Sequence, residues 1–308
     1  MVDAELRIIC GPTAAGKTTL AMALAERFGA HIVSADSRQI YRGFDIGTAK
    51  PTIAEQMRVP HHGVDVASPT ERYSAAAWAE GAQRWLAECA ATNAVPVVVG
   101  GTGFYIRALT APLFAEPELD PARRRVLAHV LDALPTAELR RWCEPLDPAR
   151  AHLGRTQLLR AVEVALLTGV PISEWHTRGG RSAGVAARYL VVDPGATLRV
   201  RIAERVSAMF AAGWPDEVAS LVSELPDDAP AWNATGYSIV REYVRGHISR
   251  AAAIEQVTIH TRQYAKRQRT WFRHQLTGAR VTMLDPTSRD AMRRAEAWWT
   301  ASEDEAAQ

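Results

Sequence analysis

A run of eight residues near the start of the chain restricts its fold more than any other feature. The run, GPTAAGKT at Gly11–Thr18, fits the pattern GxxxxGK[ST], and a strand-like segment, Leu6–Cys10, leads into it. A helical pattern follows from about Lys17 to Phe28. In this setting the backbone N–H groups of the loop and the start of the helix bind phosphate oxygens. The sequence therefore predicts a P-loop for a di- or triphosphate, a loop typical of nucleotide-binding and ATP-binding proteins.

The residues of this loop have distinct expected roles. Lys17 adds a full positive charge to the partial charge of the helix N-terminus, and the Thr18 hydroxyl can ligate Mg²⁺. We therefore expect Mg²⁺ as the cofactor, with Thr18 as its ligand from the protein. The residues expected to contact the phosphates are Gly11, Thr13, Ala14, Ala15, Gly16, Lys17 and Thr18.

Strands and helices alternate in the first third of the chain. His31–Ala35 and Val95–Val99 read as further strands, and Ser74–Ala90 has apolar residues at helical spacing. Such alternation predicts an α/β fold with a mostly parallel sheet flanked by helices, as in P-loop NTPases.

The pattern changes after Pro112. Prolines interrupt helical stretches, and the next convincing strand is Arg188–Val192. We expect three parts, with residues 1–115 as the first part of the core and 116–184 as a helical insertion domain. Residues 185–308 complete the core, mostly with helices.

Composition points to an ordinary globular protein. The net charge of +2 means that binding to nucleic acid would depend on local clusters of cations. The three cysteines, Cys10, Cys89 and Cys143, have no CxxC spacing, which predicts buried thiols rather than a disulfide framework or a zinc site. No stretch resembles a signal peptide or a membrane span, so we expect a cytoplasmic protein. We also expect it to be a monomer.

Polar residues follow the second and third predicted strands. Asp36 comes directly after the second strand, and Gly100–Tyr105, which includes Thr102, follows the third. The carboxyl ends of parallel strands share one crevice, so Asp36 can face the P-loop. It could then ligate Mg²⁺ or accept a proton, and a helix N-cap is an equally good interpretation.

Adjacent histidines at His61–His62 raise the question of a metal. Neighbouring side chains point in different directions on regular structure, and the sequence places no third ligand at a suitable spacing. We expect a structural or RNA-contacting role for this pair.

The segments together resemble the tRNA dimethylallyltransferase family, also called tRNA isopentenyltransferases. They follow the family's order and cover nearly the whole chain, and DIGTAKP together with TRQYAKRQRTWFR is highly specific. The matching segments are Gly11–Thr18, Asp36–Pro51, Pro60–Asp65, Ser68–Trp78, Val97–Leu109, Arg160–Ser173 and Thr261–Arg273.

The resemblance implies an activity. The family transfers a dimethylallyl group from dimethylallyl diphosphate to N6 of the adenosine 3′-adjacent to the anticodon of tRNA, usually with Mg²⁺, and releases diphosphate. The P-loop would bind dimethylallyl diphosphate rather than ATP, and the insertion would grip the anticodon arm. Asp36 would be the catalytic base, with Thr13 and Lys17 as the other catalytic residues. The implied tRNA contacts are Asp36, Ser37, Arg38, Gln39, Thr102, Arg124, Gln157 and Arg160.

This chain departs from the family pattern at several positions. Gly195 stands where the family usually has an arginine that helps to bind diphosphate, and Arg199 and Arg201 are candidates to replace it. Gln157 stands where an arginine is frequent, and Arg38 where small or apolar residues are common.

A basic helix expected over residues 254–275 supports RNA binding without the resemblance. At 100° per residue its cations fall on one stripe and its apolar residues on another. The alternatives are an ordinary solvated face, or cations that line the phosphate site. The stripe consists of Arg262, Lys266, Arg269 and Arg273, of which we expect the first three to contact tRNA.

Two other functions stay open at this point. A small-molecule kinase with the same P-loop would use ATP. A catalytically weak tRNA-binding protein would keep the fold, and Gly195 is the feature that favours it most.

Overall fold

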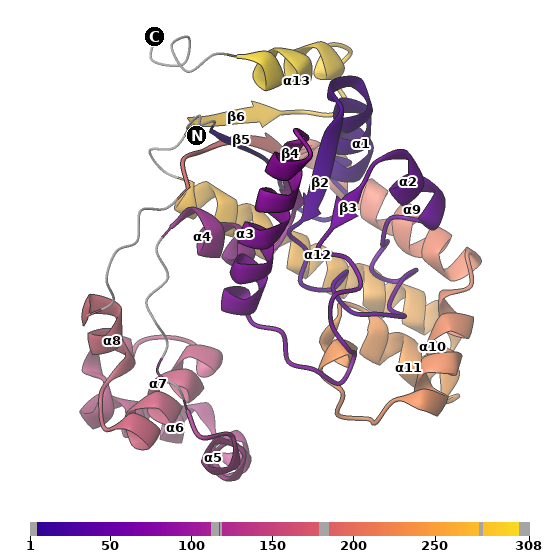
Figure 1. Cartoon of the computed structure of the whole chain (residues 1–308). Helices are drawn as coiled ribbons and strands as arrows, with labels where there is room; N and C mark the ends of the chain where they lie inside the picture. The colour runs from indigo at the N-terminus through magenta and orange to yellow at the C-terminus, as the bar shows by residue number, and fades with distance from the viewer. Residues whose placement is uncertain (1–4, 112–116, 118, 179–184, 277–279, 302–308) are drawn as a thin grey trace. The chain divides into compact units, whose positions relative to one another are not determined.

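A computed structural model describes residues 5–111, 117, 119–178, 185–276 and 280–301 of the 308-residue chain. The chain divides into two compact units, one formed by Met1–Thr110 with Val185–Gln308 and the other by Ala111–Gly184 (Figure 1). The second unit contains the segment in which the sequence predicts a helical insertion. None of the helices described is long and apolar enough to cross a membrane.

The described residues of the first unit form a six-stranded sheet in which every paired neighbour is parallel. This sheet confirms the predicted α/β class. In spatial order the strands are β3 (His61–His62), β2 (Ala30–Ser34), β4 (Val95–Gly100), β1 (Leu6–Cys10), β5 (Ala187–Val192) and β6 (Arg280–Leu284).

Helices cover both faces of this sheet because successive residues of its strands point to opposite sides. On β1, Ile8 and Cys10 join one apolar cluster, whereas Ile9 joins the other. The Ile9 face packs against α1 (Lys17–Phe28) and α13 (Ala291–Thr300). The helices of the opposite face are α3 (Ala75–Ala91), α4 (Gly103–Thr110), α9 (Leu198–Ala211), α10 (Trp214–Glu224), α11 (Tyr237–Val244) and α12 (Arg250–Gln275).

The longest of these helices, α12, is the predicted basic helix. It begins at Arg250 because the Ser249 side chain accepts a hydrogen bond from the Ala252 N–H group and caps the helix. Its buried residues recur at helical spacing and pack on the sheet side of the unit.

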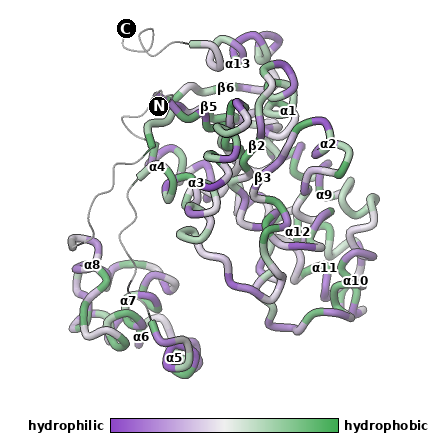
Figure 2. Tube along the Cα trace, in the orientation of Figure 1, coloured by the Kyte–Doolittle hydropathy of each residue, from purple (hydrophilic) through white to green (hydrophobic). Residues whose placement is uncertain are grey.

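The second unit is a small helical body with its own apolar core. Leu131, Leu139, Leu158 and Val162 are fully buried or nearly so within it. In Figure 2 its helices carry alternating hydrophobic and hydrophilic residues, as amphipathic helices do. The helices are α5 (Pro121–Ala133), α6 (Thr136–Leu146), α7 (Arg155–Thr168) and α8 (Ile172–Arg178).

Candidate functional site

The ends of β1, β2 and β4 meet the P-loop at a cavity of about 420 Å³. Residues 13 to 18 of the loop all line this cavity, as the sequence predicts for a phosphate site. Gly11 instead lies against β5, where a Cβ atom would be 2.2 Å from the Val192 carbonyl oxygen. Gly16 has φ +95°, a left-handed conformation that favours glycine. These two glycines therefore allow the close turn from strand to helix.

Lys17 lies inside the loop. Its Nζ atom donates a hydrogen bond to the Pro12 carbonyl oxygen at 2.7 Å. Burial lowers the pKa of Lys17 to about 8; the carboxylate of Asp36 opposes this shift and the charge of Arg205 adds to it. An anionic ligand in the cavity would restore the preference for the charged form.

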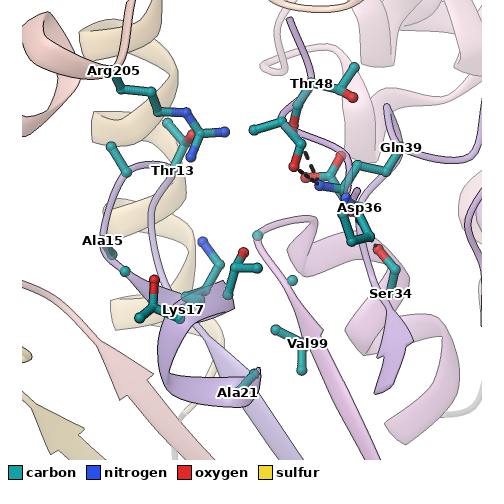
Figure 3. Close-up of a pocket in the computed structure, with 18 of the residues that line it drawn as sticks. Thr13, Ala15, Lys17, Ala21, Ser34, Asp36, Gln39, Thr48, Val99 and Arg205 are labelled. Atoms are coloured by element: carbon teal, nitrogen blue, oxygen red, sulfur yellow. Dashed lines mark hydrogen bonds between the residues drawn. The ribbon is translucent and has the colours of Figure 1, made fainter. Parts of the chain in front are cut away.

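Asp36 faces the P-loop across the cavity, as predicted, and Figure 3 shows Lys17 and Arg205 opposite it. Its Oδ1 atom accepts a hydrogen bond from the Arg38 N–H group at 2.8 Å. The carboxylate therefore closes a turn, as a capping residue does, and also lines the cavity.

The loop after β4 fixes the segment that follows Asp36. The Thr102 hydroxyl accepts a hydrogen bond from the Ser37 N–H group at 3.0 Å. Thr102 and Ser37 thus hold the ends of two neighbouring strands together, which keeps Asp36 in place. This is a positioning contact, compatible with the tRNA contact that the sequence predicts for both residues.

Gln39 joins the cavity to the segment DIGTAKP. Its Nε2 atom donates to the Ala49 carbonyl oxygen at 2.9 Å, and its Oε1 atom accepts from the Ser34 hydroxyl at 3.0 Å. Lys50 is almost wholly buried and binds the carboxylates of Asp45 and Asp65. These contacts order a segment that has neither helical nor strand periodicity.

Two arginines of α9 line the cavity opposite the sheet. Arg201 and Arg205 are one helical turn apart, and the guanidinium of Arg201 would lie 3.2 Å from a Cβ atom on Gly16. Burial lowers the pKa of Arg205, and the nearby Asp36 carboxylate opposes this shift. Of the two candidates to replace the missing arginine at Gly195, Arg201 therefore lies at the phosphate loop, whereas Arg199 is exposed.

A buried glutamine joins the P-loop to the loop after β4. The Oε1 atom of Gln268 accepts from the Thr13 N–H group at 2.8 Å, and its Nε2 atom donates to the Gly101 carbonyl oxygen at 2.9 Å. The sequence analysis missed Gln268 and Arg205. The signal for Gln268 was its place in the apolar stripe of α12, between Tyr264 and Phe272.

A smaller cavity of about 60 Å³ adjoins the first, and both are lined by Thr13, Asp36, Thr48 and Arg205. Its remaining walls are largely apolar or aromatic. They include Val206, Met209, Trp214, Val257 and Tyr264, together with Arg38.

The basic stripe of α12 divides into exposed and engaged cations. Lys266 and Arg273 are exposed. Arg269 forms an ion pair with Asp193 and donates to the Gly195 carbonyl oxygen at 2.6 Å, so it holds the turn after β5. Arg262 is half-buried. Lys266 is thus the predicted tRNA contact on this helix that is most available to a phosphate.

In the second unit, two predicted tRNA contacts share one carboxylate. Arg124 Nε lies 2.7 Å from Glu163 Oε1, and Arg160 Nη1 lies 2.6 Å from Glu163 Oε2. The Glu163 carboxylate is nearly buried, which makes this pair part of the packing of α5 on α7. Gln157 is exposed on α7.

Comparisons with known proteins identify the family. The IPP transferase model matches residues 39–275, and the isopentenyl transferase model matches residues 4–60. The chain is 42% identical over 277 residues to a tRNA dimethylallyltransferase of Thermosynechococcus vestitus, covering 89% of this chain and 88% of that one. It is also 42% identical to one of Halorhodospira halophila, with 92% and 94% covered.

Solved structures agree with these matches. The full-length tRNA isopentenylpyrophosphate transferase of Bacillus halodurans superposes with a TM-score of 0.69 at 30% identity, with 98% of each chain covered. A eukaryotic dimethylallyltransferase acting on tRNA shares the fold, with a TM-score of 0.76 at 23% identity over 95% of this chain and 78% of that one. The chain therefore belongs to the tRNA dimethylallyltransferase family.

Proposed function

We propose that this protein transfers the dimethylallyl group from dimethylallyl diphosphate to N6 of the adenosine 3′-adjacent to the anticodon of tRNA, and releases diphosphate. The observation that carries this proposal is the pair of adjoining cavities that share Thr13, Asp36, Thr48 and Arg205. The larger is lined by cations and loop N–H groups, which suit a diphosphate. The smaller has several apolar and aromatic residues in its walls, which suit a short hydrocarbon chain. The bond to be broken would then lie at their junction, beside Thr13 and Asp36.

The chemistry balances at this junction. The N6 lone pair of adenosine attacks C1 of the allylic group while the bond from C1 to the diphosphate oxygen breaks, and the diphosphate leaves with the electron pair. The N6 proton passes to the Asp36 carboxylate. Negative charge grows on the leaving oxygens, where Lys17, Arg201 and Arg205 can face it. Thr13 lines both cavities and can donate a hydrogen bond to the bridging oxygen.

The donor set at the larger cavity fits Mg²⁺. Magnesium prefers oxygen ligands and is commonly held by one or two protein groups together with substrate phosphates. The Thr18 hydroxyl and the carboxylates of Asp36 and Glu204 line this cavity. Thr18 would hold the ion, which would supply further positive charge against the leaving diphosphate.

The nucleic acid would approach the exposed cations of α12. Lys266 and Arg273 can bind phosphates, while the adenosine leaves its stack to reach Asp36. A tRNA substrate is consistent with action in the cytoplasm, and we expect the protein to act as a monomer.

The test mixes purified protein, Mg²⁺, labelled dimethylallyl diphosphate and an unmodified tRNA whose anticodon ends in A. We expect the label on the adenosine beside the anticodon, located by nuclease digestion and mass spectrometry. A tRNA that binds without acquiring label would instead indicate a degenerate binding protein. Phosphoryl transfer from ATP to a small molecule would indicate a kinase.

A further inference from the structure

Three side chains that are far apart in the sequence meet at the edge of the sheet, outside the site described above. His31 lies on β2, His62 on β3 and Cys89 on α3, elements that lie side by side in Figure 1. One ligand atom from each lies within 4.8 Å of the others. Among the described residues, these three side chains are thus grouped closely enough to bind one metal ion. Cys89 is fully buried, and both histidines are half-buried.

The distances between these atoms are those of one face of a tetrahedron around a metal ion. His31 Nδ1 lies 3.3 Å from His62 Nε2, and Cys89 Sγ lies 3.8 Å from each of these nitrogens. With zinc bonds of about 2.0–2.1 Å to nitrogen and 2.3 Å to sulfur, a tetrahedron separates two nitrogens by about 3.3 Å and nitrogen from sulfur by about 3.6 Å. The three atoms would need to move only slightly to bind one ion.

The surroundings of His62 also suit a metal ligand. Its Nδ1 atom, on the side of the ring away from the cluster, lies 3.5 Å from the Glu88 carboxylate. Histidines that bind metals commonly donate their other N–H group to a carboxylate, which fixes the tautomer and orients the ring. Glu88 is exposed, so this carboxylate is available without a packing cost.

We propose that His31 Nδ1, His62 Nε2 and Cys89 Sγ form a binding site for Zn²⁺ or a similar borderline-soft divalent ion, with water as the fourth ligand. Two imidazole nitrogens and a thiolate suit zinc, whereas Mg²⁺ prefers oxygen ligands, so this site is chemically distinct from the phosphate cavity. Binding forms two metal–nitrogen bonds and one metal–sulfur bond, and the Cys89 thiol proton passes to solvent.

Such an ion would cross-link secondary-structure elements next to the proposed catalytic residue Asp36. It would join β2, which ends beside Asp36, to β3 and α3. In the part of the chain that the structure describes, α3 also reaches the end of β2 through Trp78 Nε1, which donates a hydrogen bond to the Ser34 carbonyl oxygen at 3.0 Å. Zinc should therefore raise the resistance of this edge to unfolding.

The same atoms would interact without a metal as a hydrogen-bonded group of two neutral imidazoles and a thiol. Burial lowers the pKa of His62 and raises that of Cys89, which is compatible with that alternative. A measurement on the metal itself is therefore needed.

The experiment uses the full chain, stripped with a chelator and then titrated with Co²⁺, which reports a thiolate ligand through a sulfur-to-metal charge-transfer band. We expect this band and one equivalent of Zn²⁺ per chain by elemental analysis after dialysis. Cys89→Ser should lose both, while Cys143→Ser, which alters a buried cysteine of the other unit, should keep both. Zinc should also raise the melting temperature of the wild type and of Cys143→Ser only.

The proposal fails if the wild type shows no cobalt–thiolate band and retains no zinc, or if Cys89→Ser keeps the band. Should Cys89→Ser not fold, X-ray absorption at the zinc edge of the wild type decides the question. One sulfur and two imidazole nitrogens around the ion would support the site, and a shell of oxygen ligands alone would overturn it.

Discussion

Replacing Gln268 with methionine would remove the side chain that joins the P-loop to the loop after β4. The amide has an unambiguous orientation, because the Thr13 N–H group can only donate and the Gly101 carbonyl can only accept. Methionine has nearly the same length and no group that can replace either bond. The space is tight on this side, since a Cβ atom on Gly101 would lie 2.3 Å from Gln268 Nε2.

The expected loss of stability follows from the two groups left without a partner. A buried backbone group that loses its hydrogen bond costs about 1–3 kcal/mol. The bond to Gly101 is buried, whereas Thr13 lies at the wall of the cavity, where water can replace part of the lost bond. We therefore expect Gln268→Met to lower the free energy of unfolding by about 2–4 kcal/mol. The released Thr13 amide should also lower kcat/KM, because Thr13 lies where the allylic bond would break.

Gln263→Met is the matched control, since Gln263 is an exposed glutamine of the same helix. Surface changes of this kind stay within about 0.5 kcal/mol. Urea unfolding measures the difference, and hydrogen exchange of the P-loop amides reports the Thr13 N–H group directly. An unfolding midpoint equal to that of the control, with unchanged Thr13 protection, would refute the bridging role of Gln268.

Three further predictions concern single charges. Asp36→Asn keeps an acceptor for the Arg38 N–H group but cannot take a proton, so single-turnover transfer should slow by about 10²–10⁴-fold, and an unchanged rate would remove Asp36 as the base. Because the pKa of Lys17 is lowered to about 8, the free protein loses this cation as pH rises through that value. Affinity for dimethylallyl diphosphate, measured by calorimetry, should therefore fall between about pH 7 and 9 in the wild type but stay level in Lys17→Arg, whose guanidinium remains charged; parallel profiles would contradict this. Since Lys266 is exposed, Lys266→Ala should lower the slope of log Kd for tRNA against log salt by about one, and an equal slope would show that Lys266 contacts no phosphate.

The parts of the fold that could be predicted are those whose residues are buried on both faces of the sheet. β1 and α1 have the predicted bounds, Leu6–Cys10 and Lys17–Phe28, because a continuous apolar run and a glycine-rich turn mark them. β6 was missed, because we expected residues 185–308 to complete the core mostly with helices. In this edge strand the first three residues are half-buried, Met283 is 56% exposed and Leu284 is buried, so burial shows no period of two. β3 has only two residues, too few for any periodicity to show.

The sequence predicted those parts of the candidate site whose positions follow from the ends of neighbouring strands. Asp36 faces the P-loop because parallel strands end at the same edge of the sheet. The hydrogen bond of Gln268 could not be predicted, because its partner Thr13 is 255 residues away and no local sequence pattern marks the pair. Sequence distance also hid the cluster that contains His31 and Cys89. The spacing along the chain gave no third ligand for a metal site, whereas the packing of α3 on the sheet brings these side chains together.

The structure also bears on whether Gly195 weakens the case for catalysis. Gly195 has φ +60°, and a Cβ atom there would meet nothing within 4 Å, so its side chain would point away from packed residues. Its carbonyl is held by Arg269, which fixes the turn without any side chain at position 195. The cavity itself receives its positive charge from Lys17 on the sheet side and from Arg201 and Arg205 on α9. Because charge close to the leaving oxygens stabilises the transition state, these three cations would supply that stabilisation in the proposed reaction without an arginine at position 195.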